Sequence, residues 1–201
     1  MKDSLIIVIF FIAGIIAGIF VDPPSFLETE KAIDYALYGL LLMVGINLGA
    51  DPRFPEIIRS IRPRIFFIPL STLAGTTLGV MAYSLLFDAR PFGEILAVGF
   101  GFGYYSLSSV ILTQLSGDEL GLIALLANIS REVITLLFAP FFAKLTGKIG
   151  PIAAGGATSM DTTLPIILKS SGKQYLIHSM VHGVILSVLV PILVSFAFQL
   201  T

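Results

Sequence analysis

Long apolar runs without a single charged side chain dominate this sequence and limit what the chain can fold into. Five such runs contain no Asp, Glu, Lys or Arg: Ser4–Val21, Tyr35–Ala50, Ile65–Phe87, Ile95–Gly117 and Gln174–Thr201. Apolar stretches of about 18 or more residues are long enough to cross a bilayer. Charged residues make up 12% of the chain, whereas soluble domains contain about 25%. We therefore expect an integral, multi-pass membrane protein, surrounded by lipid.

Composition excludes several other classes of protein. The formal net charge of −1 provides no basic face for nucleic acid. The chain has no cysteine, which excludes disulfides, thiolate nucleophiles and cysteine-based metal sites. The longest polar stretch, Asp51–Arg64, is too short for a soluble domain. We expect one transmembrane domain over residues 1–201, and no pattern in it points to a cofactor.

Seven hydrophobic segments are expected to form an all-α, polytopic helix bundle. They are Leu5–Val21, Ala32–Ala50, Ile65–Phe87, Ile95–Ser116, Leu120–Ala143, Ile149–Leu168 and Leu176–Leu200. The fourth and sixth segments are unusual, because they carry glycines and hydroxyl residues and, in the sixth, Pro151, Asp161 and Pro165. Such backbone is tolerated at membrane depth only beside protein or a water-filled cavity. A pair of interrupted segments is typical of a transporter binding site.

The lysines and arginines outside the segment interiors favour one topology. If all seven segments cross and the amino terminus is cytoplasmic, these residues divide seven inside to four outside. If the fourth and sixth segments are re-entrant, the division becomes nine to two. The inside set is then Lys2, Arg53, Arg59, Arg62, Arg64, Lys144, Lys148, Lys169 and Lys173. The positive-inside rule therefore predicts about five full spans and two opposed re-entrant or broken segments.

Three charged residues lie deep within apolar segments: Arg131, Glu132 and Asp161. Each costs at least about 2.5–3.5 kcal/mol there unless it is paired or hydrated. Arg131 and Glu132 can brace the bundle, but adjacent helix positions do not face each other, so each needs its own partner. Arg131 can pair with Asp161, which leaves Glu132 free to bind a proton. Asn128 lies one turn before Glu132 and extends this polar face.

Two carboxylates in a cavity of low dielectric constant suit an exchanger of cations for protons. Burial raises the pKa of a carboxyl group, and a cationic substrate then competes with the proton for the same site. The amino ends of broken helices can hold an anionic group of the substrate, while their carboxyl ends can hold a cation. Intramembrane ionisable groups of this kind point to transport rather than to enzymatic catalysis.

Other polar residues allow alternative interpretations. His178 and His182 are one turn apart, but two histidines make only half of a metal site, and we expect none. His182 is a better candidate for a proton pathway. The hydroxyl residues of the fourth segment either pack within the bundle or line the substrate path: Tyr104, Tyr105, Ser106, Ser108 and Ser109. An intramembrane hydrolase using Ser108 or Ser109 with His182 would lack the usual G-x-S-x-G elbow.

Four motifs resemble the prokaryotic lysine exporter family of the LysO type. The sixth segment contains G-G-A-T-S-M-D-T-T-L-P (Gly155–Pro165), similar to the family's G-A-T-S-M-D-x-T-L-P. Gly101–Ser108 resembles its G-F-G-[WY]-Y-S-L-S run, and Asn128–Glu132 resembles N-x-x-R-E. Val181–Gly183 and Leu189–Leu193 are similar to its last helix. These motifs are spread over most of the chain.

The resemblance implies export of L-lysine and its analogue thialysine across the cytoplasmic membrane, with proton antiport as the expected coupling. Residues on or beside the motifs are then expected to bind substrate or proton: Asn128, Arg131, Glu132, Ser159, Asp161, Thr162, Tyr105, Ser106, Ser108 and His182. Full-length members carry about three more hydrophobic segments before the matched part. The resemblance therefore also implies a short companion membrane polypeptide or a homodimer, or else a non-transporting subunit that completes a partner.

Overall fold

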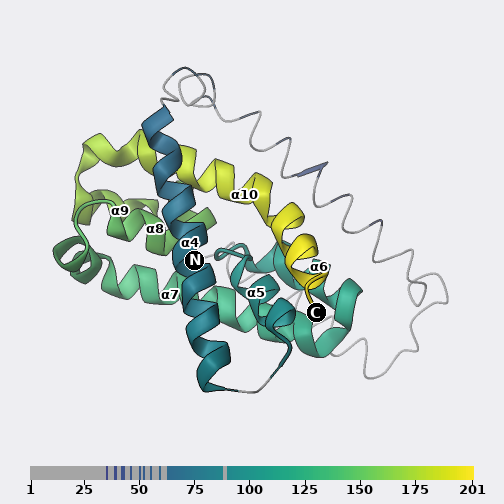
Figure 1. The fold of residues 1–201 in the computed structure, drawn as a ribbon. Helices are drawn as coiled ribbons and strands as arrows, with labels where there is room; N and C mark the ends of the chain where they lie inside the picture. The colour runs from purple at the N-terminus through teal and green to yellow at the C-terminus, as the bar shows by residue number, and fades with distance from the viewer. Residues whose placement is uncertain are drawn as a thin grey trace, which may run out of the picture. The chain divides into compact units, whose positions relative to one another are not determined.

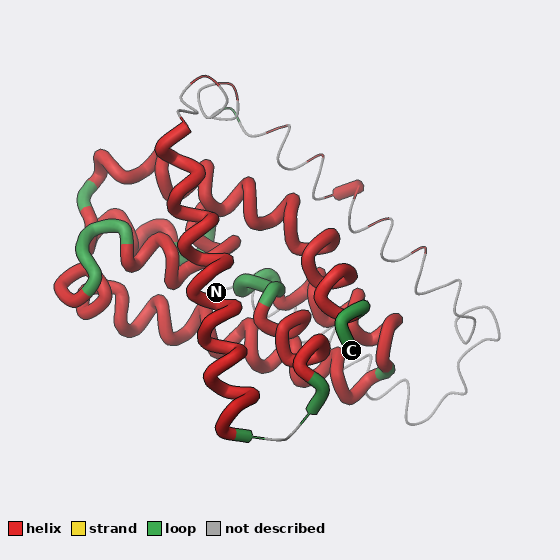
Figure 2. Tube along the Cα trace, in the orientation of Figure 1, coloured by secondary structure: helices red, strands yellow, loops and turns green. Residues whose placement is uncertain are grey.

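The computed structural model describes residues 63–87 and 90–201, together with residues 35, 39, 42, 43, 46, 50, 52, 55 and 59. The chain divides into two compact units, Met1–Tyr38 and Gly39–Thr201, and the elements below belong to the second. Every regular element in the two continuous ranges is a helix (Figure 2), which confirms the predicted all-α class. The predicted spans Leu5–Val21 and Ala32–Ala50 lie outside these ranges.

Among the described residues, three helices are long and apolar enough to cross a membrane. Helices α4 (Phe67–Leu86), α7 (Asp118–Leu145) and α10 (Leu176–Phe198) contain 20, 28 and 23 residues. At 1.5 Å per residue they are about 30 to 42 Å long, enough for a hydrocarbon core of about 30 Å. Short 3-10 turns precede two of them, η1 (Pro63–Phe66) before α4 and η3 (Lys173–Tyr175) before α10. The three corresponding predicted segments are confirmed.

The fourth predicted segment folds as a hairpin that returns to the side where it begins. It consists of α5 (Phe92–Gly99), a break at residues 100–104, and α6 (Tyr105–Ser116). A hydrogen bond shows that the two ends of this hairpin lie close together. The hydroxyl of Ser116, at the end of α6, donates to Glu94 Oε1, near the start of α5, at 3.5 Å. The glycines and hydroxyl residues of this segment therefore form a bend inside the bundle, and the segment does not cross to the other side.

The sixth predicted segment forms a second hairpin of the same kind. It consists of α8 (Gly150–Gly155), the 3-10 helix η2 (Gly156–Met160) and α9 (Leu164–Ser171). Lys148, before α8, donates from Nζ to the carbonyl oxygen of Ser170, at the end of α9, at 3.0 Å. This segment too leaves on the side where it enters.

The two hairpins come from opposite ends of α7 and meet at their tips. The first hairpin ends where α7 begins, and α8 follows soon after α7 ends. In Figure 1, α5 and α6 lie at one end of α7, and α8 and α9 lie at the other. The tips are joined by a backbone hydrogen bond from Ala157 N to Phe102 O at 2.9 Å. The prediction of two opposed re-entrant segments is confirmed.

Helices α4 and α10 hold the hairpins in place. Gly183 of α10 lies against the second tip so closely that a Cβ atom there would be 2.6 Å from Met160 Cβ. Ile68 of α4 packs with Ile152 and Ile167 of the second hairpin in one buried cluster. Helix α10 therefore packs against the second tip, and α4 packs against the two arms of the second hairpin.

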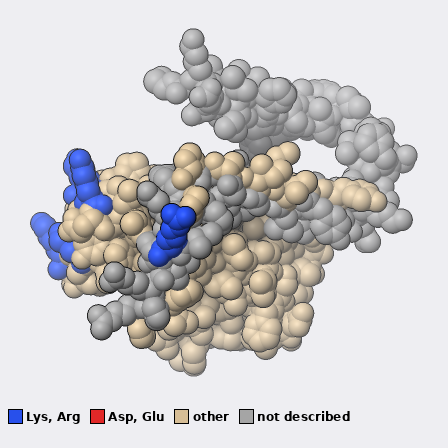
Figure 3. Space-filling model, turned by 90° about the horizontal axis from the view of Figure 1, so that it is seen from above, with Lys and Arg blue, Asp and Glu red and all other residues tan. Residues whose placement is uncertain are grey.

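The two ends of α7 carry charges of opposite sign. Near its start, Arg90 forms ion pairs with Glu94 and Glu119, and hydrogen bonds to these two carboxylates raise the pKa of the Arg90 guanidinium. The other end carries exposed lysines: Lys144, Lys148, Lys169 and Lys173. Figure 3 shows basic side chains gathered towards this lysine-bearing end. The positive-inside rule predicts that the lysine end faces the cytoplasm.

Single cysteines test this topology cleanly, because the chain has none of its own. Lys148→Cys is expected to react with a membrane-impermeant maleimide only from the cytoplasmic side, and Asp118→Cys only from the outside. Ser116→Cys should share the accessibility of Asp118→Cys, since it lies at the same end of α7. Labelling of Lys148→Cys from the outside would contradict the orientation.

Candidate functional site

A cavity of about 220 Å³ opens where the two hairpin tips meet α7 and α10. Four elements contribute to its wall, and both predicted acids line it. The polar lining residues are Tyr104, Tyr105, Ser106, Glu132, Thr158, Asp161, Thr162 and Ser187. Five of the predicted binding residues are therefore brought together: Glu132, Asp161, Thr162, Tyr105 and Ser106.

The two acids have different surroundings within the cavity. Asp161 Oδ1 accepts hydrogen bonds from the backbone N–H and, at 3.3 Å, from the hydroxyl of Thr162. Glu132 is half-buried and forms no hydrogen bond or ion pair with any residue that the structure describes. Neither carboxylate is neutralised by a described basic side chain, so both are available to a cation or a proton.

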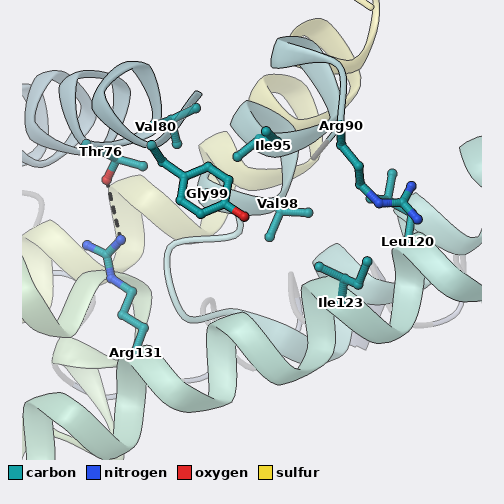
Figure 4. A pocket seen from close by; sticks show the side chains of 11 residues that line it. Thr76, Val80, Arg90, Ile95, Val98, Gly99, Leu120, Ile123 and Arg131 are labelled. Carbon is teal, nitrogen blue, oxygen red and sulfur yellow. Dashed lines mark hydrogen bonds between the residues drawn. The ribbon is translucent and has the colours of Figure 1, made fainter. Parts of the chain in front are cut away.

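Arg131 has a different partner from the one that its sequence position suggested. Its Nε donates to Ala154 O and its Nη2 to Ala153 O, each at 3.0 Å. Its Nη1 donates to Thr76 Oγ1 of α4 at 3.4 Å (Figure 4). The predicted ion pair between Arg131 and Asp161 is therefore wrong.

The reason for this difference lies in the break after α8. Helix α8 ends at Gly155, and its last carbonyl groups carry partial negative charge without a helical partner. The guanidinium of Arg131 neutralises this end, and it also lies 5.7 Å from the centre of the Phe102 ring. Because adjacent helix positions point about 100° apart, Arg131 braces the hairpins while Glu132 faces the cavity.

Replacing Arg131 should therefore lower stability more than it changes substrate recognition. Arg131→Gln is expected to cost about 2–4 kcal/mol, because two carbonyl groups lose a charged donor. Arg131→Lys should cost less, about 1–2 kcal/mol, since it retains the charge but not the forked geometry. Unfolding in mixed micelles measures both. Arg90→Gln is the control, because its ion pairs are near the surface and contribute little to stability.

Asn128 and Ser108 hold the break of the first hairpin and do not line the acidic cavity. Asn128 Oδ1 accepts from Gly103 N at 2.7 Å, and its Nδ2 donates to Val98 O at 3.1 Å. The Ser108 hydroxyl donates to Tyr104 O at 3.0 Å. Both side chains are fully buried. Their geometry fits a positioning role for the tip.

His182 joins three elements through its two ring nitrogens. Nε2 lies 3.0 Å from Thr72 Oγ1 of α4, and Nδ1 lies 3.0 Å from Ser159 Oγ of η2. The Ser159 hydroxyl also donates to Ser179 O at 2.9 Å, and the Thr72 hydroxyl donates to Ile68 O at 3.1 Å. Both ring nitrogens of His182 therefore have partners other than Ser108 and Ser109, the two serines considered for a hydrolase.

Comparison with known proteins identifies the family of the chain. The family model described as "Lysine exporter LysO" matches residues 8–198. The chain belongs to the lysine exporter LysO family. The resemblance drawn from the motifs is therefore confirmed. No solved structure matches the chain.

Two relatives show how much of a family member's length this chain matches. "Lysine exporter LysO" of Escherichia coli is 33% identical over 174 residues, which are 86% of this chain and 57% of that protein. "Putative lysine exporter" of Haemophilus influenzae is 34% identical over 162 residues, 81% of this chain and 82% of that protein. The chain thus spans little more than half the length of the E. coli relative.

The motifs that resemble the LysO family meet at one point in the structure. Gly155–Pro165 forms the tip of the second hairpin and the start of α9, and Gly101–Ser108 forms the tip of the first. Asn128–Glu132 lies in the middle of α7, and Val181–Gly183 lies on α10 against η2. Segments distant in the sequence of this LysO family member therefore build one site.

Sequence reasoning missed several lining residues of this LysO family site, notably Ser187 on α10. A serine in a long apolar helix normally suggests packing. One signal was present, since Ser179, Gly183 and Ser187 follow each other at intervals of four residues. This spacing puts small residues on one helical face, and that face meets the second tip.

A larger cavity of about 510 Å³ lies between α4, α5 and α7 (Figure 4). Its walls are mainly apolar, with Val80, Ile95 and Ile123 among them, and Arg131 and Arg90 are its charged lining residues. Neither acid lines it. We therefore assign the candidate site of this LysO family member to the smaller cavity, which is lined by both acids.

Proposed function

We propose that this chain forms the substrate- and proton-binding part of a secondary exporter of L-lysine that works by proton antiport. The observation that carries the proposal is the pair of acids, Glu132 and Asp161, on one cavity at the meeting point of two opposed hairpins. The names of the two relatives support lysine as the cargo. Export, rather than catalysis, also accounts for both acids.

Exchange follows from competition for the same carboxylates. Ionised, they accept charge-assisted hydrogen bonds from the ammonium groups of lysine. Protonated, they lose the charge that holds the cation, so binding protons releases lysine. Because both ligands need the same oxygen atoms, the loaded site carries one or the other. An inward proton gradient then drives lysine outward.

Access to the cavity from alternate sides is the second requirement. Each hairpin reaches the meeting point from one end of α7 only, and the tips are linked by few backbone contacts such as Ala157 N to Phe102 O. A small displacement of one tip against the other would open the cavity towards one side and close it towards the other. Binding near the midplane between repeated broken segments is the usual basis of such transport.

The complete transporter would include more than this chain. The chain spans little more than half of the E. coli relative, and we propose that a short companion membrane polypeptide or a second copy completes it. Thialysine, which shares the two ammonium groups and the carboxylate of lysine, would occupy the same site.

Lysine counterflow in proteoliposomes, driven by a pH gradient, tests this function. Vesicles containing the chain, with and without a neighbouring short hydrophobic polypeptide, should exchange lysine and move protons. Glu132→Gln is expected to remove the proton movement and lower lysine exchange at least about 10-fold, because it removes a charged acceptor. Glu119→Gln, at the exposed end of α7, is the matched control and should retain both.

The same assay distinguishes the proposed exporter from the main alternative, a non-transporting subunit. A non-transporting subunit that only completes a partner would tolerate neutralisation of both acids. Coupled exchange that persists in a Glu132→Gln, Asp161→Asn double variant, with the partner present, would contradict the proposed function and support that alternative.

A further inference from the structure

The two acids account for the ammonium groups of lysine but leave its carboxylate without a partner. A cavity that holds Glu132 and Asp161 repels a third carboxylate by Coulomb's law. If the proposed function is correct, the cavity needs a group of positive character that faces the substrate carboxylate. The described lining contains no lysine, arginine or histidine, so the groups of positive character within it are backbone and hydroxyl dipoles.

The amino end of α6 supplies such a dipole. Helix α6 is 12 residues long, its cap residue Tyr104 makes no side-chain capping bond, and its first turn contains no acidic residue. Tyr104, Tyr105 and Ser106 all line the cavity. The first N–H groups of a helix have no partner inside the helix and carry partial positive charge. Such ends bind carboxylate and phosphate groups directly.

An independent feature of α10 points to a ligand at the same place. Ser187 lines the cavity, its exposed fraction is 2%, and its hydroxyl has no hydrogen-bond partner among the residues that the structure describes. Ser195, two turns further along the same helix, behaves ordinarily, because its hydroxyl donates to Pro191 O at 2.8 Å. A buried hydroxyl without a partner is unfavourable, unless a ligand satisfies it.

We infer that the first-turn N–H groups of α6 and the hydroxyl of Ser187 form a carboxylate subsite, which binds the α-carboxylate of a free amino acid. The opposed acids take its ammonium groups, so the cavity matches all three charges of lysine. This inference rests on the proposed function and adds selectivity to it. The site distinguishes an amino acid from a diamine or an amino-acid amide of similar length.

Three ligands show which charged groups of lysine contribute to binding. Lysine has all three groups, 1,5-diaminopentane lacks the carboxylate, and 6-aminohexanoate lacks the α-ammonium group. Their binding to the full chain in lipid nanodiscs is measured by titration calorimetry. The wild-type chain should bind lysine at least about 10-fold more tightly than diaminopentane, the usual effect of losing a hydrogen-bonded charge.

Variants of Ser187 and Ser106 test whether the proposed subsite produces the preference for lysine over diaminopentane. Ser187→Ala should weaken lysine and 6-aminohexanoate about 10-fold while changing diaminopentane less than about 2-fold. Ser195→Ala is the matched control and should bind all three ligands as the wild type does. Ser106→Asp places a carboxylate at the amino end of α6 and should bring the affinities for lysine and diaminopentane close together, whereas Ser106→Asn should not.

The outcomes distinguish this inference from the function on which it rests. Wild-type chain that binds diaminopentane as tightly as lysine would overturn the carboxylate subsite and leave a cation exporter intact. An equal loss for all ligands in Ser187→Ala would do the same, since it would indicate a structural role. Wild-type chain that binds neither lysine nor diaminopentane would overturn the proposed function itself.

Discussion

Asp161→Asn is expected to abolish coupled lysine transport while leaving the fold intact. The substitution keeps the size of the side chain and can still accept from the N–H of Thr162, as Asp161 Oδ1 does. It removes the group that ionises, so the site can neither bind a proton nor attract an ammonium group. Lysine affinity should fall about 10- to 100-fold, and pH-driven counterflow should fall to the level of protein-free vesicles.

The control for Asp161→Asn is Asp118→Asn, an exposed acid in the first turn of α7. It should cost only about 0.3–1 kcal/mol through the helix dipole and leave transport unchanged. Stability of both variants is compared by thermal unfolding. Normal flux in folded Asp161→Asn protein would rule out the proposed role of Asp161.

Gly156→Ala should produce the largest loss of stability, because Gly156 lies where the two tips touch. Its φ of +62° is unfavourable for residues with a Cβ atom, and a Cβ there would lie 2.1 Å from the carbonyl oxygen of Phe102. The left-handed conformation costs about 1–2 kcal/mol and the overpacking about 1–3 kcal/mol. We expect a total loss of about 2–5 kcal/mol, measured by unfolding in mixed micelles.

Gly147→Ala separates the two contributions. Gly147 also has a positive φ, +82°, but nothing lies within 4 Å of the position a Cβ atom would take. It should therefore cost only the conformational part, about 1–2 kcal/mol. Equal losses for the two variants would show that the contact between the tips does not stabilise the protein.

Much of the fold could be predicted because the bilayer imposes simple rules. Lengths of apolar sequence located α4, α7 and α10 to within a few residues, since a span must cover a fixed thickness. The distribution of lysines and arginines favoured two re-entrant segments over two more crossings. The contacts of Ser116 with Glu94 and of Lys148 with Ser170 agree with that choice.

The roles of the polar residues were less predictable. Arg131, Asn128 and His182 were all candidates for substrate or proton binding, because sequence shows that a group is polar and buried but not what it contacts. In the structure their donors and acceptors satisfy broken backbone and link helices. A break in a helix frees carbonyl and N–H groups, and these need partners as much as a substrate does.

The sequence by itself determined that this is a polytopic membrane protein of the LysO family, with charged groups confined to loops except at a few interior positions. Only the tertiary structure decided that Glu132 and Asp161 share a cavity while Arg131 turns to α8, and that Ser187 joins them. The reason is geometric. Hydropathy acts along the chain and fixes how deep a residue lies, whereas partners depend on how hairpins from opposite ends meet, which is a matter of distant contacts.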